Sequence, residues 1–133
     1  MKNTARVEVI AGVVLKKDGK YLLVQEKQPK AYMLWNLPAG RTDEGETIEA
    51  AAIREAKEEC GFDVELGKEL LVLHQAIDKP VMHAFEAEII GGELAFPEDE
   101  MLDARWFTYK EIQSMKDKLR NQEFILGAIK LAK

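Results

Sequence analysis

Three glutamates, Glu55, Glu58 and Glu59, stand three and four residues apart near the end of a segment with helical spacing. On a helix, these offsets place all three carboxylates on one face within about one turn. The arrangement opposes helix stability, because like charges repel at this spacing and the carboxyl end of a helix favours cations. Three carboxylates that converge on one point supply the oxygen ligands that Mg²⁺ prefers. The spacing therefore indicates a divalent-cation site, with a solvated charged face as the alternative.

The helix that carries these glutamates is predicted to begin after Thr47, a suitable N-cap, and to run through Cys60. Gly61 then supplies the left-handed residue that ends it. Ile53, Ala56 and Cys60 fall roughly opposite the glutamates, so we expect this stripe to face the core and Cys60 to be buried. Three further residues fall on the glutamate side, one or two turns upstream: Ile48, Ala51 and Ala52.

Apolar and β-branched runs before and after this helix predict strands, and Asp18-Gly19 between the first two runs predicts a hairpin. The segment 39–46 is predicted to be a loop, and 96–103 an acidic loop. The expected strands cover 7–15, 21–26, 33–37, 63–66, 69–76, 81–90 and 105–109, and the expected closing helices cover 110–115 and 122–131. This order of strands, helix, strands and helix predicts an α/β sandwich with a mixed sheet.

Length and charge narrow the classes of partner. The chain has 133 residues, which predicts a single domain over 1–133. A net charge of −5 argues against loose binding to nucleic acid or to an anionic membrane. The only cysteine allows no intrachain disulfide, and the N-terminal segment has neither a signal-peptide pattern nor a run long enough to span a bilayer. We therefore expect a cytoplasmic protein, with a homodimer left open.

The stretch from Gly40 to Phe62 resembles the Nudix box. Its fixed residues, at the spacing of that family, are Gly40-x5-Glu46-x7-Arg54-Glu55-Ala56-x-Glu58-Glu59-x-Gly61-Phe62. Ala56 departs from the larger aliphatic residue that is usual there, which affects packing and not chemistry. The preceding WNLPAG and the later RWF also resemble segments of the family. The resemblance implies an α/β/α sandwich that hydrolyses a nucleoside diphosphate linked to another group, assisted by Mg²⁺ or Mn²⁺.

The resemblance also implies roles for individual residues. Glu55, Glu58 and Glu59 are implied as metal ligands, together with the backbone carbonyl of Ala39. Arg54 either clamps phosphate or holds a glutamate by a bidentate pair, and the family favours the second role.

The general base is left open between a box glutamate, such as Glu55 or Glu58, and a glutamate of the acidic loop. In that loop Glu98 and Glu100 are the candidates for the base or for an extra metal ligand, and a solvated acidic loop is the alternative.

The expected substrate is a small-molecule nucleotide, namely a (deoxy)nucleoside tri- or diphosphate that is either ordinary or oxidised. ADP-ribose or a nucleotide sugar is the alternative, and a nucleotide-sensing domain without catalysis is the alternative from another class. Such sensing domains usually lose box glutamates, and this chain keeps all of them. Trp35 is a candidate for stacking on a nucleobase, with core packing as the alternative. Tyr32 is a candidate for a second substrate contact.

Overall fold

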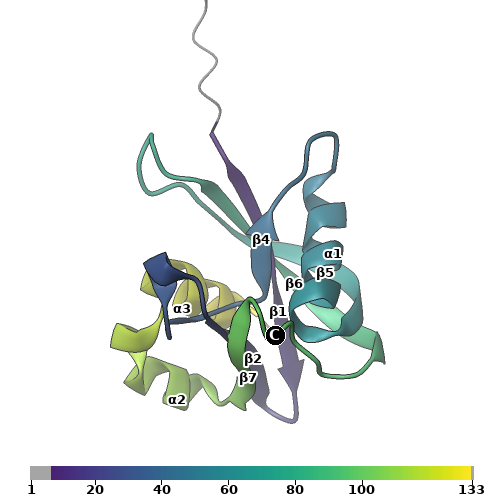
Figure 1. Ribbon diagram of the computed structural model, residues 1–133, viewed down its shortest axis with the longest axis vertical. Coiled ribbons are helices and arrows are strands. Elements are labelled where there is room, and N and C mark those ends of the chain that lie inside the picture. The colour runs from purple at the N-terminus through teal and green to yellow at the C-terminus, as the bar shows by residue number, and fades with distance from the viewer. Residues whose placement is uncertain (1–6, 133) are drawn as a thin grey trace, which may run out of the picture.

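The computed structural model of the chain describes residues 7–132 (Figure 1). The domain boundaries predicted at residues 1 and 133 lie outside this range. The strands are β1 (Val9–Lys17), β2 (Lys20–Glu26), β3 (Trp35–Asn36), β4 (Ala39–Arg41), β5 (Phe62–Leu73), β6 (Val81–Gly92) and β7 (Met101–Phe107). The helices are α1 (Ile48–Cys60), α2 (Tyr109–Ser114) and α3 (Gln122–Leu131), with short 3₁₀ turns η1 (Pro29–Ala31) and η2 (Lys116–Lys118).

The strands within the described range form one mixed sheet whose main path is β3-β2-β1-β6-β5. β1 and β6 run parallel, and the other neighbours are antiparallel. The hairpin between β1 and β2 turns at Asp18 and Gly19, which both have positive φ, as the Asp-Gly pair predicts. None of the helices within residues 7–132 combines the length and the apolar content needed to cross a bilayer.

Helices cover both faces of this sheet. α1 packs on one face against β1, β4 and β5, whereas α3 packs against β5 and β6 and α2 against β7 (Figure 1). The side chains of β1 alternate between the two faces, so Ala11, Val13 and Leu15 join the apolar cluster under α1 and Val14 joins the cluster under α2 and α3. The predicted α/β/α sandwich with a mixed sheet is confirmed.

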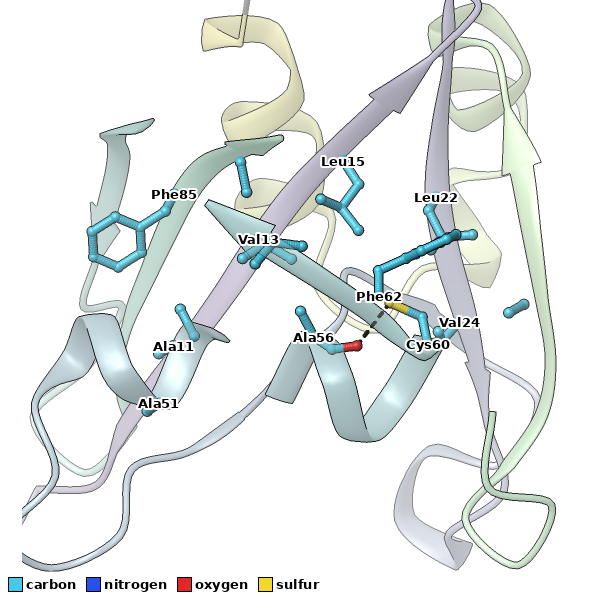
Figure 2. Packing of buried hydrophobic residues seen from close by; sticks show 14 of the residues in the cluster. Ala11, Val13, Leu15, Leu22, Val24, Ala51, Ala56, Cys60, Phe62 and Phe85 are labelled. Carbon is cyan, nitrogen blue, oxygen red and sulfur yellow. Dashed lines mark hydrogen bonds between the residues drawn. The ribbon is translucent and has the colours of Figure 1, made fainter. Parts of the chain in front are cut away.

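The buried face of α1 consists mainly of alanines. Ala51, Ala52, Ala56 and Cys60 are fully buried, and Figure 2 shows Ala51, Ala56 and Cys60 with the β-strand side chains of the same cluster. The thiol of Cys60 donates to the carbonyl oxygen of Ala56 at 3.0 Å, and burial raises its pKa to about 12. The expectation that Cys60 is buried is therefore correct.

The expectation for the rest of this face is wrong in one respect. Ile53, which was expected to face the core, is 41% exposed, whereas Ala51 and Ala52, on the glutamate side, are buried. The helix is rotated so that Glu55 and Glu59 reach β4, and this rotation brings the neighbouring alanines onto the sheet and turns Ile53 away from it.

Several strand boundaries also differ from the prediction. The two strands expected at 63–66 and 69–76 are one strand, β5, whose pairing with β6 shifts register between Leu66 and Leu71. Residues 39–41 form β4 rather than loop, because they pair with the first half of β1. β7 begins at residue 101, inside the expected acidic loop, because it pairs with β2 as far as Glu26.

Candidate active site

Both ends of α1 are set by residues that the sequence identifies. Thr47 is the N-cap, and its hydroxyl oxygen accepts the backbone N–H of Ala50 at 3.0 Å. Gly61 adopts a left-handed conformation at φ 82° and donates its N–H to the carbonyl of Lys57. The predicted helix limits are confirmed, and they fix where the last turn of α1 presents its glutamates.

Arg54 joins α1 to the loop before it. Its Nε and Nη2 atoms donate to the two carboxylate oxygens of Glu46 at 2.8 and 2.9 Å, and Nη2 also donates to the carbonyl of Arg41 at 2.9 Å. The hydrogen bond from Arg54, followed by one from the backbone N–H of Asp43, lowers the pKa of Glu46 to about 2. In this geometry Arg54 holds a glutamate by a bidentate pair, which is the role that the family resemblance favours, and the pair ties Glu46 to α1.

The guanidinium of Arg54 also donates hydrogen bonds to two glutamates of α1. Its Nη1 atom donates to Glu55 Oε2 at 3.0 Å and to Glu58 Oε1 at 3.1 Å. Burial raises the pKa of Glu55, while the charge and hydrogen bond of Arg54 act in the opposite direction. Arg54 therefore relieves part of the repulsion between carboxylates that the spacing predicts.

Glu59 is one of two buried charged residues in the described range, at 8% exposure. Its Oε1 atom accepts the backbone N–H of Ala39 at 3.0 Å. Burial is the main cause that raises the pKa of Glu59 well above its ordinary value, and the charges of Glu55, Glu26 and Glu100 raise it further. The carboxylate thus lies in a strongly negative environment beside β4.

Gly40 leaves room for Glu55. A Cβ atom at this position would overlap the carboxyl carbon and both carboxylate oxygens of Glu55. Gly40 has no positive φ, so the requirement for glycine here is close approach and not backbone conformation. Glycine at this position therefore allows a site carboxylate to pack against β4.

The donor set consists of oxygen atoms, which suits Mg²⁺ or Mn²⁺. Within residues 7–132, no three His, Cys, Asp or Glu side chains are grouped closely enough to hold a metal ion as they stand. Glu55 and Glu58 point to Arg54, and Glu59 points to the Ala39 N–H. The three carboxylates share one region, and the buried negative charge there is only partly neutralised by protein groups, so the residues fit a cation.

The acidic loop is tied to the end of β2. The backbone N–H of Lys27 donates to the carbonyl of Glu100 at 3.1 Å, and Lys27 Nζ donates to the carbonyl of Glu98 at 2.9 Å. The charge of Glu100 helps to raise the pKa of both Glu55 and Glu59, behind burial as the main cause in each. Glu100 is therefore a loop candidate that lies within electrostatic reach of the site.

The two aromatic candidates for substrate binding lie in different surroundings. Trp35 is 8% exposed and packs edge-on against Phe107, with 5.0 Å between the ring centroids. This contact supports the core-packing alternative for Trp35. Tyr32, next to η1, is 56% exposed and is free to meet a ligand.

Sequence reasoning missed the surroundings of Glu26. This residue is 3% exposed, and Gln28, Asn36 and Arg120 all donate to its carboxylate. Arg120 is far away in the sequence, and a glutamate at the end of a strand next to a polar loop resembles a solvated residue. The sequence contains no spacing signal from which this cluster could have been found.

The chain matches one protein family over most of its length, and its relatives include named hydrolases and phosphatases. The NUDIX domain family matches residues 5–126. The 8-oxo-dGDP phosphatase NUDT18 of Danio rerio is 38% identical over 105 residues, which cover 77% of this chain and 32% of the relative. The NAD-capped RNA hydrolase NudC of Vibrio atlanticus is 35% identical over 105 residues, covering 79% of this chain and 38% of the relative. The chain thus spans about a third of the length of these relatives.

A solved structure is similar over nearly the whole chain. A NUDIX hydrolase from Nitrosomonas europaea superposes with a TM-score of 0.82 at 27% identity, covering 96% of this chain and 70% of that one. An ADP-ribose pyrophosphatase from Streptococcus suis has a TM-score of 0.76 at 23% identity, covering 95% and 89% of the two chains, and this likeness concerns the fold alone.

Proposed function

Because the chain belongs to the Nudix family, we propose that it hydrolyses a phosphoanhydride bond in nucleoside diphosphate-linked compounds with the help of Mg²⁺ or Mn²⁺. The observation that carries this proposal is the cluster of Glu55, Glu58 and Glu59 at the end of α1, which Arg54 ties to Glu46. A non-catalytic sensing domain has no need of a complete set of box carboxylates.

Four groups are proposed to hold the cation: the carboxylates of Glu55, Glu58 and Glu59 and the backbone carbonyl of Ala39. A bound divalent cation neutralises phosphate charge and lowers the pKa of a coordinated water. Glu58 has the most exposed side chain of the three, at 56%, so it is the carboxylate best able to turn from Arg54 toward a ligand. The candidates for the group that accepts a proton from water are Glu55, Glu58, Glu98 and Glu100.

The proposed substrate is a (deoxy)nucleoside di- or triphosphate, including oxidised forms. Support comes from the similarity to NUDT18, whose name describes an 8-oxo-dGDP phosphatase. The similarity to NudC, named as an NAD-capped RNA hydrolase, supports the alternative in which a nucleoside diphosphate carries a larger group, as in ADP-ribose or a nucleotide sugar.

A product screen with a matched pair of variants tests this function. The wild type is incubated with Mg²⁺ or Mn²⁺ and 8-oxo-dGDP, 8-oxo-dGTP, ADP-ribose, NAD and a nucleotide sugar, and the products are separated by chromatography. Release of phosphate, of pyrophosphate or of two monophosphates identifies both the substrate class and the bond that is cleaved. We expect Glu58→Gln to lower turnover by about 100-fold or more, because it removes a carboxylate from the site.

Glu49→Gln is the matched control, since Glu49 is an exposed glutamate in the first turn of the same helix. It should turn over like the wild type, and chelation by EDTA should abolish the activity of both. Nucleotide binding without any product, or a Glu58→Gln variant as active as the wild type, would contradict the proposal.

A further inference from the structure

Glu26 is the second buried charged residue in the described range, and the proposed reaction assigns it no role. It is the last residue of β2, at the point where pairing with β7 shifts register. Arg120 Nη1 donates to Glu26 Oε1 at 2.7 Å, Asn36 Nδ2 donates to Oε2 at 3.0 Å, and Gln28 Nε2 also donates to Oε1. A buried carboxylate with three side-chain donors has a defined orientation.

One branch of this cluster leads to Glu59. Asn36, whose amide nitrogen donates to Glu26, accepts the backbone N–H of Leu37 through its own Oδ1 at 2.9 Å. Two residues further on, the N–H of Ala39 donates to Glu59 at 3.0 Å. The orientation of Asn36 therefore restrains the short segment that ends at the Ala39 backbone and its contact with the site carboxylate.

A second branch leads to the acidic loop. Lys27, the residue after Glu26, donates its backbone N–H to the carbonyl of Glu100 and its Nζ to the carbonyl of Glu98. Fixing Glu26 in place also fixes the following peptide, because the two are joined covalently. The position of Glu100 relative to Glu59 thus depends on the end of β2.

Arg120 closes the cluster from the other side. Its backbone N–H donates to the carbonyl of Trp35 at 2.8 Å while its side chain pairs with Glu26. Leu119 forms a parallel bridge with Trp35. The segment before Ala39 is therefore held between Arg120 and β2, and the one ion pair of Glu26 in the described range links the two sides.

We propose that Glu26 is a positioning residue, which sets the distance between the Ala39–Glu59 side of the metal site and Glu100 of the acidic loop. This inference rests on the proposed function, since it concerns the same cation site. Glu26 touches neither substrate nor metal in this role, and it acts through Asn36 and the Lys27 backbone. Residues that orient metal ligands typically cost about 10- to 100-fold in metal affinity or activity when they are replaced.

The test measures Mn²⁺ binding without substrate, by electron paramagnetic resonance or titration calorimetry, alongside turnover and thermal unfolding. Glu26→Gln should weaken Mn²⁺ binding by about 10-fold or more and raise the Mn²⁺ concentration needed for half-maximal activity. The double variant Glu26→Met/Arg120→Met removes both charges together, and apolar replacement of a buried ion pair is often neutral or stabilising. It should keep the melting temperature of the wild type and still lose Mn²⁺ affinity.

Thr108→Ala is the control for simple loss of stability, because it breaks the capping box of α2, which packs on the face of the sheet opposite α1. It should lower the melting temperature and leave Mn²⁺ binding unchanged. If the Glu26 variants bind Mn²⁺ like the wild type, or if Thr108→Ala weakens binding equally, the positioning role is wrong while the proposed hydrolysis stands. If the wild type neither binds Mn²⁺ nor hydrolyses any substrate, the proposed function itself fails.

Discussion

At the scale of single residues, Arg54 determines how three crowded carboxylates can exist on one helix. It donates to Glu46, Glu55 and Glu58 and to one backbone carbonyl. A lysine keeps the charge but lacks the planar fork that bonds two carboxylate oxygens at once. The structure therefore explains the arginine of the box by geometry as well as by charge, and it explains the anchoring of the loop that carries Glu46.

Gly40 gives the sharpest residue-scale prediction. Gly40→Ala should displace the Glu55 carboxylate, because the added methyl overlaps it, and should lower both Mn²⁺ affinity and turnover by about 10-fold or more. Gly67→Ala is the matched control, since a Cβ there would lie 3.4 Å from the Glu86 carbonyl oxygen, an ordinary contact. Titration with Mn²⁺ and steady-state kinetics provide the measurements. An unimpaired Gly40→Ala enzyme would show that Glu55 is free to move without consequence.

At the scale of elements, α1 shows what local sequence can predict and where it stops. Thr47 and Gly61 act within one turn of themselves, so the helix limits could be read from them. The buried face could not, because it depends on β4, which was expected to be loop and whose pairing with β1 is a long-range contact. The same reason explains why Glu26 was missed, since its partner Arg120 is brought to it only by the complete fold.

The orientation of α1 predicts that truncating an isoleucine costs less unfolding free energy than enlarging an alanine, which hydrophobicity alone would not suggest. Ile53→Ala should cost little, roughly 0.5 kcal/mol or less, because Ile53 is 41% exposed. Ala56→Leu should destabilise the fold by about 1–3 kcal/mol, because Ala56 is fully buried against the sheet. Urea unfolding of both variants measures the difference. A larger loss of unfolding free energy for Ile53→Ala than for Ala56→Leu would contradict the partly exposed position of Ile53.

At the scale of the whole molecule, the fold carries a net charge of −5 and concentrates negative charge at its site. Burial raises the pKa of Glu55 and of Glu59, the charge of Glu100 raises both further, and the charge of Glu26 raises that of Glu59. The burial and mutual repulsion of these carboxylates lower the stability of the folded protein, and a bound cation would offset this loss. The charge of the chain could be counted from the sequence, but its concentration at one site follows from the fold.

Glu59→Gln is predicted to raise the melting temperature by several degrees in EDTA at neutral pH. The folded-state pKa of Glu59 lies above its unfolded value, so ionisation costs stability at neutral pH, and this cost shrinks as the pH falls from the folded-state pKa to the unfolded value. The difference between variant and wild type should therefore shrink as the pH is lowered from neutral toward 4.5, the ordinary pKa of a glutamate, as measured by calorimetry.

Two other glutamates, Glu46 and Glu49, serve as comparisons for this experiment. Glu46 acts with the opposite sign, because its stabilising contribution is lost only as the pH falls toward its lowered pKa of about 2, below the range tested. Glu49→Gln, on the exposed side of the same helix, should leave the curve unchanged. A Glu59→Gln variant that is less stable than the wild type at every pH would mean that the Ala39 contact outweighs the cost of burial.

The parallel pairing of β1 with β6 has a consequence for the order of folding. Val9 pairs with Val81, so this part of the sheet cannot form until two segments distant in sequence meet, which is intrinsically slow. β4 pairs with β1, and Glu55 and Glu59 contact β4, so the site as observed depends on the sheet as well as on α1. The capacity to bind a cation would then appear as a late event in refolding, at the rate of sheet closure and not at the rate of helix formation.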